Sequence, residues 1–472
     1  MCGNCIECDK PHEECGIFGI YSYKGDNLAK DIYFGLYALQ HRGQESAGIA
    51  VSDLKEIKCH KGMGLCNQVF NEANLSTLHG NLAMGHVRYS TTGSSIIENA
   101  QPIIVESKFG PVAVAHNGNL INTEDLREEL KEKGVVFSGT TDTEVLAHLI
   151  ATSEKNDFMD ALLDALNRIK GSFSTMIMTT DKLIALKDPN GIRPLCIGKL
   201  DNSYIVSSES CGLDILGAQF VREISNGEIV VIDAEGMKSR TWATGAREAL
   251  CIFEFIYFAR PDSIIRNRTL YDTRVTMGKY LAKEHPVEAD IVMPVPESGV
   301  PAAIGYSQES KIPYGEGLIK NRYVGRTFIQ PSQEIRALGV RIKLNPIQDA
   351  VRGKKVVIID DSIVRGTTSR QIVKLIKDAG AREVHMRVSS PKILNPCFYG
   401  IDTATRAELI AANLSLEGIC KYIDAESLGY LSLRNLIKSI ALPERSLCMA
   451  CFNDDYPVKI PEKMQSLKLF FK

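Results

Sequence analysis

The sequence has almost no net charge and no long apolar run. Its 472 residues include 55 Lys and Arg against 57 Asp and Glu, which gives a formal net charge of −2 at pH 7. No global field draws such a chain onto nucleic acid or an anionic membrane, so neither is an expected partner. No stretch approaches the ~18 uncharged apolar residues of a membrane helix, and residues 1–14 lack the apolar core of a secretory signal. The expected location is the cytoplasm.

Internal repeats, low-complexity tracts and the conditions for a disulfide framework are missing as well. Without a period of about 20 to 50 residues, solenoids and repeat arrays are excluded. The composition, 44% hydrophobic and 24% charged, is that of an ordinary globular protein with a sizeable core. The 13 cysteines occur in a chain without a secretory signal, where thiols stay reduced, so they point to catalysis or metal binding.

The pattern of secondary structure changes near residue 245. Before it, short β-rich runs at 81–89 and 111–115 alternate with turn-type sequences at 117–119 and 190–191, which predicts stacked sheets with a few helices. The expected helices begin at Asn122 or Thr123, at Asp142 with Thr141 and Glu144 in capping-box spacing, and at Phe158. This half is therefore expected to have an α+β fold.

After about residue 250 the pattern becomes strand, loop, helix, strand. Strands are expected at 290–296, 355–360 and 383–388, and a helix at 368–379. A strand, a crossover helix and a following strand form a βαβ unit, which predicts a mostly parallel sheet with helices on both faces. Two domains of unlike architecture, α+β and then α/β, are therefore expected.

Two adjacent acids and a hydroxyl-rich loop follow the strand at 355–360. The strand delivers Asp360 and Asp361 to the carboxyl edge of the sheet, and the loop from Arg365 to Ser369 then opens a helix. Backbone N–H groups at a helix start, next to hydroxyls and a glycine, form a cradle for phosphate. The dinucleotide-binding and P-loop glycine patterns are both absent. The alternative is a βα loop with an incidental acid pair.

This segment resembles the phosphoribosylpyrophosphate-binding motif of type I phosphoribosyltransferases. Its Arg365-Gly366, where Thr-Gly is usual, is similar to the amidophosphoribosyltransferase branch. The resemblance implies that Asp360 and Asp361 contact the ribose. It implies that the 5-phosphate is held by Arg365, Gly366, Thr367, Thr368 and Ser369.

The same resemblance assigns two further segments to the pyrophosphate. Ser298 lies in the turn 296–301 that would meet it, and Mg²⁺ is expected on the pyrophosphate near Ser298, Asp360 and Asp361. A flap at 320–328 would close over the sugar, and its cations would neutralise the departing group. These cations are Lys320, Arg322 and Arg326. A solvated basic loop is the alternative interpretation of the flap.

A cysteine stands at the head of a β-like run near the start of the chain. Cys15 is followed by Gly16, which clears space around it. As an internal residue, Cys15 would be an ordinary buried thiol. If the bond between Glu14 and Cys15 were cut, the new α-amine, which titrates near ~8, could act as general base for its own thiol. This interpretation predicts that residues 1–14 are a leader.

Four further segments, 40–48, 85–91, 116–120 and 141–144, resemble the glutaminase domain of the N-terminal-nucleophile amidotransferases. The resemblance implies that Cys15 attacks the glutamine amide. The other implied roles are an oxyanion hole of Asn117 and Gly118, a carboxylate-binding Arg88 and an ammonium-binding Asp142. Structural roles are expected for His41, His86 and His116, because the free amine already supplies a base.

Together the two halves resemble the iron–sulfur, propeptide-bearing, Bacillus-like branch of the amidophosphoribosyltransferase family, which are pentosyltransferases. The implied organisation is a leader at 1–14, an αββα glutaminase domain at 15–245 and a type I phosphoribosyltransferase domain at 246–472. The implied reaction joins ammonia from glutamine to phosphoribosylpyrophosphate, giving phosphoribosylamine, glutamate and pyrophosphate at the opening of purine biosynthesis. A dry internal passage would keep ammonia from becoming ammonium. A homotetramer inhibited by purine nucleotides is also implied.

Four cysteines are candidate cluster ligands. Spacing alone makes Cys448-Met-Ala-Cys451 a possible metal or redox pair, because a lone C-x-x-C is weakly specific. The resemblance adds Cys251 and Cys397 and implies a structural [4Fe–4S] cluster. A four-cysteine zinc site is the alternative.

The remaining cysteines are expected to take no part in catalysis. The run Cys2, Cys5 and Cys8 is assigned no role in the mature protein, with a metal that regulates processing as the alternative. Packing roles are expected for Cys59, Cys66, Cys196, Cys211 and Cys420.

Two other functions compete with this interpretation. A regulatory protein could keep the phosphoribosylpyrophosphate fold as a sensor, but it would tolerate loss of the glutaminase segments and carry a basic DNA-binding module. A sugar-phosphate aminating synthase would share only the glutaminase half, and the loop after Asp360 and Asp361 argues against it.

Overall fold

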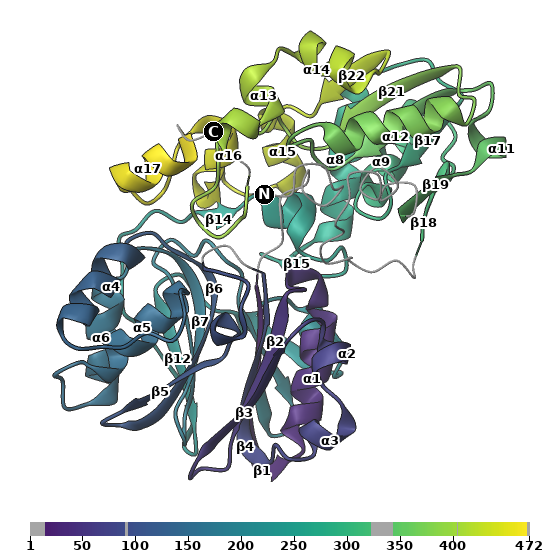
Figure 1. The fold of residues 1–472 in the computed structure, drawn as a ribbon. Coiled ribbons are helices and arrows are strands. Elements are labelled where there is room, and N and C mark those ends of the chain that lie inside the picture. The colour runs from purple at the N-terminus through teal and green to yellow at the C-terminus, as the bar shows by residue number, and fades with distance from the viewer. Residues whose placement is uncertain (1–14, 90–92, 322–342, 404, 470–472) are drawn as a thin grey trace.

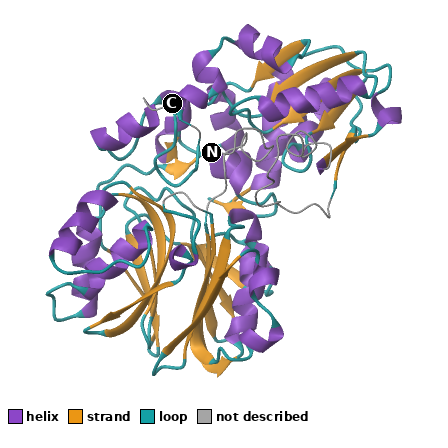
Figure 2. Cartoon of the chain, in the orientation of Figure 1, coloured by secondary structure: helices purple, strands orange, loops and turns teal. Residues whose placement is uncertain are grey.

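The computed structural model describes residues 15–89, 93–321, 343–403 and 405–469. The first half of the chain forms two stacked antiparallel sheets, and the second half forms a parallel sheet wrapped in helices (Figure 1). Figure 2 shows strands concentrated in the first half and helices around the sheet of the second. In the described part of the chain, no helix is long and apolar enough to cross a membrane.

The first sheet has seven strands. Their order is β11 (Gln219–Glu223), β9 (Cys196–Leu200), β10 (Ser203–Ser207), β1 (Gly16–Asp26), β4 (Gly80–Arg88), β2 (Ser46–Ser52) and β3 (Ile57–Met63). Helices α1 (Leu28–Ala38) and α7 (Cys211–Asp214) cover its outer face. Along β1, Phe18 and Ile20 pack beneath α1, whereas Ile17 and Tyr21 face the second sheet. This alternation follows from the two-residue period of a strand with both faces buried.

The second sheet has six strands. Their order is β13 (Gly236–Thr241), β12 (Glu228–Asp233), β8 (Leu183–Lys187), β7 (Gly171–Met178), β6 (Gly110–Leu120) and β5 (Ile103–Ser107). Its outer face is covered by α4 (Thr123–Glu132), α5 (Asp142–Ala151) and α6 (Phe158–Arg168). The inner faces of the two sheets share one apolar cluster. The layers are therefore helix, sheet, sheet, helix, which confirms the predicted αββα sandwich.

The predicted turn at 117–119 is wrong. These residues lie inside β6, where Asn117, Gly118 and Asn119 pair with Ser174, Phe173 and Ser172 of β7. The Asn-Gly pair has local turn propensity, but eight consecutive pairs with a central neighbouring strand outweigh it. The predicted turn at 190–191 is confirmed, because Gly191 has φ +65° and its N–H donates to the Asp188 carbonyl at 3.0 Å.

The parallel sheet confirms the predicted βαβ unit. Its order is β17 (Ile291–Pro294), β20 (Lys355–Asp360), β21 (Glu383–Val388) and β22 (Ser427–Tyr430). Helices α8 (Leu270–Glu284) and α9 (Val300–Ser310) pack on one face. Helices α12 (Thr367–Asp378) and α14 (Leu416–Ile423) pack on the other. The first predicted strand is shorter than 290–296, since only 291–294 pair with β20.

Short elements complete the two halves. In the first they are η2 (Gln40–Arg42), α2 (Cys66–Val69), α3 (Glu72–Leu75) and η3 (Ile97–Asn99). In the second they are β14 (Leu250–Cys251), η4 (Glu254–Phe258), β15 (Ile264–Ile265), β16 (Arg268–Thr269), β18 (Leu318–Lys320), β19 (Leu344–Pro346), α11 (Gln348–Val351), η5 (Arg406–Glu408), α13 (Ile410–Asn413), α15 (Leu433–Ile440), η6 (Glu444–Ser446), β23 (Leu447–Cys448), α16 (Ala450–Asn453) and α17 (Glu462–Leu469).

The two halves share a core. Ile121 and Ile192 of the sandwich belong to the same apolar cluster as β14, η4 and the carboxyl-terminal segment. In Figure 1 that segment, coloured yellow, returns from the parallel sheet to lie over the sandwich. Residues of the second half therefore reach the edge of the first.

Candidate functional site

Cys15 lies directly before β1 and is almost fully buried, with 7% of its surface exposed. Its Sγ donates to the Tyr89 carbonyl at 3.5 Å. A Cβ added to Gly16 would lie 2.9 Å from Cγ2 of Val87, so glycine allows this close approach of strands β1 and β4. Burial raises the pKa of the Cys15 thiol to about 11, although the charge of Arg88 opposes that shift. At neutral pH the thiol therefore needs a base to become a nucleophile.

The nearby histidines have other partners. His86 is buried with Nε2 3.2 Å from the His116 carbonyl, and burial lowers its pKa to about 3. The Nδ1 of His116 lies 3.5 Å from Asp142, and the Nε2 of His41 lies 2.7 Å from Glu209. Among the described residues, no histidine ring shares a hydrogen bond with Sγ of Cys15. The geometry agrees with the expected structural roles of these histidines.

The Asn117 side chain is buried without a hydrogen-bond partner. It is 1% exposed, and neither its Nδ2 nor its Oδ1 bonds to another described residue. A buried amide that stays unpaired costs about 1–3 kcal/mol, so such groups commonly serve a ligand or a reaction. Asn117 and Gly118 lie on β6, which contacts β1, the strand that Cys15 begins. A buried amide donor without a described partner, on a strand that contacts the one begun by the thiol, has the chemistry that an oxyanion hole requires.

Arg88 and Asp142 both lie within electrostatic range of the Cys15 thiol. The Arg88 guanidinium contacts the Glu45 carboxylate, and Nη1 also donates to the Ser94 carbonyl at 3.2 Å. The Asp142 carboxylate accepts the Leu120 N–H at 3.0 Å. The structure thus brings the two predicted glutamine contacts to the thiol, each with a partner inside the chain. Glu45 lies within a segment that the sequence singled out, yet its pairing with Arg88 was missed.

Burial of the Asp142 carboxylate opposes its ionisation, but the charge of His116 outweighs it and holds the pKa of Asp142 below its usual value. The same pairing raises the pKa of His116 above its usual value despite burial. The start of α5 holds Asp142 in place because Thr141 caps it by accepting the Thr143 N–H at 3.4 Å. Glu144 does not close a capping box; its carboxylate instead accepts the N–H groups of 138 and 139.

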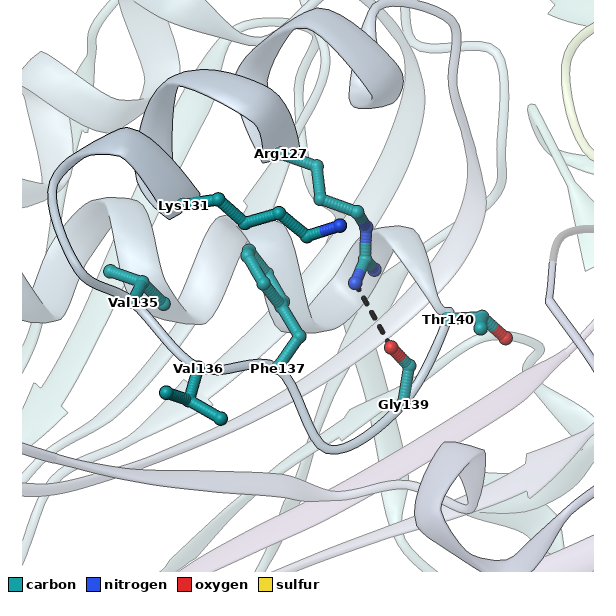
Figure 3. Close-up of a pocket in the computed structure, with 7 residues that line it drawn as sticks. All are labelled: Arg127, Lys131, Val135, Val136, Phe137, Gly139 and Thr140. Carbon is teal, nitrogen blue, oxygen red and sulfur yellow. Dashed lines mark hydrogen bonds between the residues drawn. The ribbon is translucent and has the colours of Figure 1, made fainter.

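A cavity of about 560 Å³ lies behind the loop that leads into α5. Figure 3 shows Arg127 reaching from α4 to this loop, with the Phe137 ring beside it. The guanidinium donates to the carbonyls of Gly139 and Thr141 at 2.9 and 2.8 Å. The cavity is lined by Arg127, Lys131, Val135, Val136, Phe137, Gly139 and Thr140. None of the predicted site residues lines it, so Arg127 supports the loop before Asp142 rather than the site itself.

The second half contributes a loop to the edge of the sandwich strands β6 and β7. The Phe398 carbonyl accepts the Asn119 amide at 2.8 Å, and the Tyr399 carbonyl accepts the Ser172 hydroxyl at 2.6 Å. Gly400 follows with φ +106°, and a Cβ there would lie 2.9 Å from the carbonyl carbon of Gly118. Nothing in the sequence predicted this contact, because its partners lie more than 200 residues apart.

The phosphate loop has the predicted form. Asp360 ends β20, and both acids are 1% exposed. The Asp361 carboxylate accepts the Ser362 hydroxyl at 2.6 Å and also contacts the Ser298 hydroxyl. The turn predicted to meet pyrophosphate and the acid pair are therefore adjacent.

Helix α12 begins directly after Gly366, whose φ is +80°. A Cβ at this position would lie 2.7 Å from Cδ1 of Ile410, so glycine is required for both conformation and space. Thr368 and Ser369 are buried in the first turn of α12. The backbone N–H groups of a first turn have no partner within the helix, so they are available to a ligand. The neighbouring Arg365 pairs with Glu408 at 3.2 Å. The predicted phosphate residues are thus contiguous at one helix end.

Of the predicted flap, only its first residues are described. Lys320 is exposed on β18, opposite Leu344 of β19. Arg322 and Arg326 lie outside the described residues.

The four cysteines predicted as cluster ligands share one buried apolar cluster. Cys251 and Cys448 lie opposite each other in the parallel pair β14 and β23. The Cys451 carbonyl accepts the Asn395 N–H at 3.0 Å, which brings α16 to the segment that carries Cys397. Burial raises the pKa of Cys251 and Cys448 to about 12. Four buried thiolate donors have the chemistry of an iron–sulfur or zinc site, but in the described residues no three His, Cys, Asp or Glu side chains are close enough to hold a metal.

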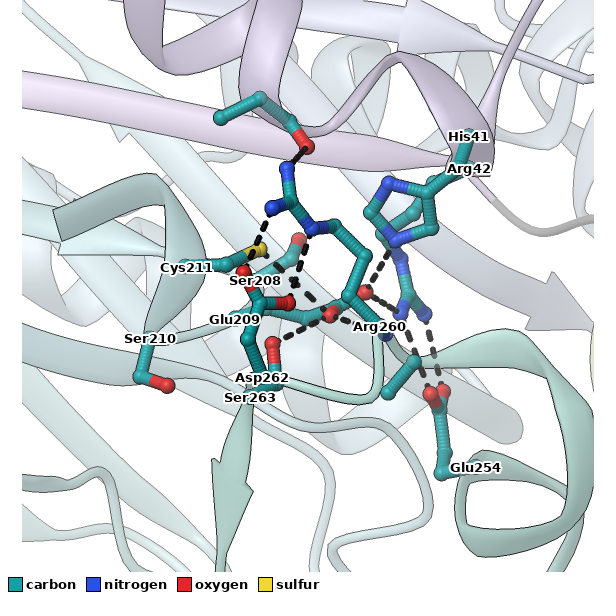
Figure 4. Close-up of polar contacts among 12 residues, drawn as sticks. His41, Arg42, Ser208, Glu209, Ser210, Cys211, Glu254, Arg260, Asp262 and Ser263 are labelled. Atoms are coloured by element: carbon teal, nitrogen blue, oxygen red, sulfur yellow. Dashed lines mark hydrogen bonds and ion pairs between the residues drawn. The ribbon is translucent and has the colours of Figure 1, made fainter. Parts of the chain in front are cut away.

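The sequence also missed a buried ionic cluster where the two halves meet. Figure 4 shows the Arg42 guanidinium between the carboxylates of Glu209 and Glu254. The His41 ring also contacts the Glu209 carboxylate. Arg42 lies in the segment 40–48, which the sequence singled out for other reasons, and Glu254 lies three residues after Cys251. Their pairing depends on two halves of the chain meeting, which no local pattern records.

Both halves match known domain families. The glutamine amidotransferase domain family matches residues 86–214, and the phosphoribosyl transferase domain family matches residues 276–392. An amidophosphoribosyltransferase of Synechococcus elongatus is 53% identical over 470 residues, covering 98% of this chain and 95% of the relative. One of Methanocaldococcus jannaschii is 51% identical over 463 residues, covering 94% of this chain and 98% of the relative.

Two solved structures share the whole fold. One, described as the allosteric regulatory enzyme of purine biosynthesis, has a TM-score of 0.90 at 47% identity and covers 95% of this chain and 97% of that chain. The other is glutamine phosphoribosylpyrophosphate amidotransferase from B. subtilis complexed with ADP and GMP; its TM-score is also 0.90 at 47% identity, with 95% and 98% coverage.

The sandwich with its buried cysteine and the parallel sheet with its phosphate loop define a glutamine amidotransferase joined to a phosphoribosyltransferase. With relatives about half identical over nearly its full length, the chain belongs to the amidophosphoribosyltransferase family.

Proposed function

We propose that Cys15, freed at its amino group by removal of residues 1–14, is the nucleophile that opens glutamine in this amidophosphoribosyltransferase. The observation that carries the proposal is a buried thiol, with a pKa raised to about 11, that hydrogen-bonds to no described histidine. An α-amine on the same residue would supply the missing base. The unpaired Asn117 amide and the Gly118 N–H would stabilise the tetrahedral oxyanion.

Glutamine would be oriented by two charges beside the thiol. Arg88, whose guanidinium also contacts Glu45, would hold the α-carboxylate of glutamine. Asp142, whose carboxylate also lies 3.5 Å from His116, would hold the α-ammonium. The products of this half would be glutamate and ammonia. Residues 15–245 would form the glutaminase domain.

Residues 246–472 would form the phosphoribosyltransferase domain, which receives the ammonia. Asp360 and Asp361 would hold the ribose hydroxyls, and the start of α12 would bind the 5-phosphate. The 5-phosphate set is Arg365, Gly366, Thr367, Thr368 and Ser369. Ammonia attacking the activated carbon of phosphoribosylpyrophosphate releases pyrophosphate, which Ser298, Lys320 and Arg326 would help to bind. Adjacent carboxylates and a hydroxyl suit Mg²⁺, which would neutralise charge on the pyrophosphate.

A [4Fe–4S] cluster on Cys251, Cys397, Cys448 and Cys451 remains part of the proposal. It is supported by four buried thiols in one apolar cluster, two of them in register on neighbouring strands. Such a cluster would tie the carboxyl-terminal segment to the domain core. A four-cysteine zinc site is the alternative, and visible absorbance separates the two.

We also propose that purine nucleotides regulate the enzyme and that it works in purine biosynthesis as a homotetramer. The B. subtilis neighbour is complexed with ADP and GMP, and a second neighbour is described as an allosteric regulatory enzyme of purine biosynthesis. Inhibition of initial rates by added ADP or GMP, and the mass in solution, test these points.

One experiment tests the central assignment. Anaerobically purified protein is analysed by intact mass and assayed with glutamine and, separately, with ammonium salts. The expected mature chain begins at Cys15, and Cys15→Ser is expected to lose glutamine use while keeping ammonia-dependent synthesis. Fully active enzyme that still carries Met1, or equal loss of both activities in Cys15→Ser, would refute the proposal.

A further inference from the structure

A buried ion pair joins the two halves directly behind the nucleophile. Arg42 ends η2 in the glutaminase half, and Glu254 begins η4 in the other half. The guanidinium nitrogens lie 2.8 and 3.0 Å from the two Glu254 oxygens, and both side chains are inaccessible to solvent. Such a two-point contact fixes the plane of the guanidinium as well as its position.

The same guanidinium also holds the nucleophile. Its Nε donates to the backbone carbonyl of Cys15 at 3.2 Å. Because the guanidinium is rigid and planar, the carboxylate that orients its outer nitrogens also orients Nε. A displacement of Glu254 would therefore be transmitted through Arg42 to the backbone of Cys15.

Neutralising Arg42 does not require Glu254. Glu209, from the glutaminase half, already lies 2.5 Å from Nη1 of Arg42. Glu254 in turn also faces Arg193, at 3.8 Å. Glu254 is thus the second carboxylate of the cluster, and it differs from Glu209 in coming from the other half of the chain.

The far side of η4 is anchored to the phosphoribosyltransferase helix α8. Arg274 of α8 is buried, and it donates to the carbonyls of Phe255 at 2.9 Å and Ala259 at 2.7 Å. Burial lowers the pKa of Arg274 to about 10, and the charge of Asp361 in the ribose site opposes this shift. The segment η4 is therefore held at one end by Arg42 and along its length by a residue within electrostatic range of the phosphoribosyl site.

We propose that Glu254 is a positioning residue for Cys15, acting through Arg42, so that the phosphoribosyltransferase half completes the glutaminase site. The inference rests on the proposed role of Cys15 as the nucleophile. In this arrangement the nucleophile is correctly placed only when η4 is docked against Arg42. Glutamine hydrolysis therefore depends on the domain that consumes the ammonia.

The test is Glu254→Gln in the full-length protein. Glutamate release is measured across glutamine concentrations, and phosphoribosylamine formation is measured with an ammonium salt. We expect kcat for glutamine hydrolysis to fall about tenfold or more with KM for glutamine within about twofold, because alignment and not binding is lost. Ammonia-dependent synthesis should stay within about twofold of the wild type.

A second variant guards against misfolding. Arg42→Lys keeps a positive charge between the carboxylates, but one ammonium cannot reproduce the planar fork that reaches Glu254 and the Cys15 carbonyl together. Arg42→Lys should show the same loss of kcat. If Glu254→Gln is insoluble, the kcat of Arg42→Lys tests the inference in its place. In the double variant the two losses should not add, because both break one contact chain.

Glu228→Gln is the matched control. Glu228 makes a similar two-point contact with Arg222, at 2.7 and 2.9 Å, inside the glutaminase half. It should leave kcat for glutamine within about twofold of the wild type. Wild-type kcat in both Glu254→Gln and Arg42→Lys, or parallel losses of glutamine and ammonia activity, would overturn the inference. If wild-type protein fails to release glutamate, or Cys15→Ala still does, the proposed function itself is wrong.

Discussion

Gly400 lies against the backbone of Gly118, so a residue of the phosphoribosyltransferase half touches the proposed oxyanion hole. A Cβ at Gly400 would lie 2.9 Å from the carbonyl carbon of Gly118 and 3.0 Å from its Cα. Both glycines have positive φ, +106° and +143°. The strand proposed to hold the oxyanion and the segment that carries Cys397 are therefore packed without space for a methyl group.

Gly400→Ala should impair glutamine hydrolysis more than ammonia-dependent synthesis. The added methyl group must displace the Gly118 backbone or the 397–400 segment, and a one-ångström shift at a reacting centre costs up to about 100-fold. The ratio of the two activities is the measurement. Gly353→Ala is the control, because Gly353 also has positive φ, at +72°, but a Cβ added there would have nothing within 4 Å. An unchanged ratio in Gly400→Ala would show that the methyl group fits without disturbing the Gly118 backbone.

Asn117→Ala should lower kcat for glutamine by about 10²–10³-fold, the usual effect of deleting an oxyanion donor. Its stability should change little or rise, since the variant removes a buried amide that has no partner among the described residues. Steady-state kinetics and thermal unfolding are measured on the same preparation. A strongly destabilised variant with normal kcat would mean that the amide is a packing group.

Asp361→Asn should reduce phosphoribosylamine formation from both glutamine and ammonia by about 10- to 100-fold, because charge-assisted hydrogen bonds contribute roughly 1.5–3 kcal/mol. Glutamine hydrolysis alone should persist, since Asp361 lies in the other half. The exposed acid Asp349, changed to Asn, is the control in the same domain. Unimpaired synthesis by Asp361→Asn would refute the ribose assignment.

The pair of Asp142 and His116 should make stability depend on pH. The pKa of His116 is raised above 6.5 and that of Asp142 is lowered below 3.8, so both are charged between these values and their attraction is fully present there. As pH rises through the elevated pKa of His116, the proton leaves and that contribution is lost. The unfolding free energy lost in Asp142→Asn should therefore be larger near about pH 6 than near about pH 9. A difference independent of pH would show that His116 is neutral.

Loss of the proposed cluster should unfold the carboxyl-terminal segment. Cys448→Ser should abolish visible absorbance and iron content, and protease should cleave residues 447–469 faster, because the buried thiols would lose the group that ties them together. Cys420→Ser is the control, since Cys420 is half-buried on α14 and packs against a different apolar cluster from the four proposed ligands. Wild-type protein that contains bound zinc and shows no visible absorbance would favour the zinc site.

Local patterns were sufficient for much of the fold. The strands at 355–360 and 383–388 were predicted with their observed bounds, because a buried parallel strand is a continuous apolar run that ends in polar residues. The turn predicted at 117–119 failed because its Asn-Gly signal is local, whereas pairing with β7 is not. The same strand placement puts Asn117 on β6, which contacts β1, the strand that Cys15 begins.

The predicted phosphate loop could be located from the sequence because its acids, glycine and hydroxyls are contiguous along the chain. The candidate nucleophile could be located because Cys15 stands next to a glycine at the head of a strand. The contacts that support these residues depend on tertiary structure. Arg42 and Glu254 are 212 residues apart, and only the docking of the two halves places one guanidinium between a carboxylate and the Cys15 carbonyl. Contacts of that kind depend on how complete domains pack, and no spacing along the chain encodes them locally.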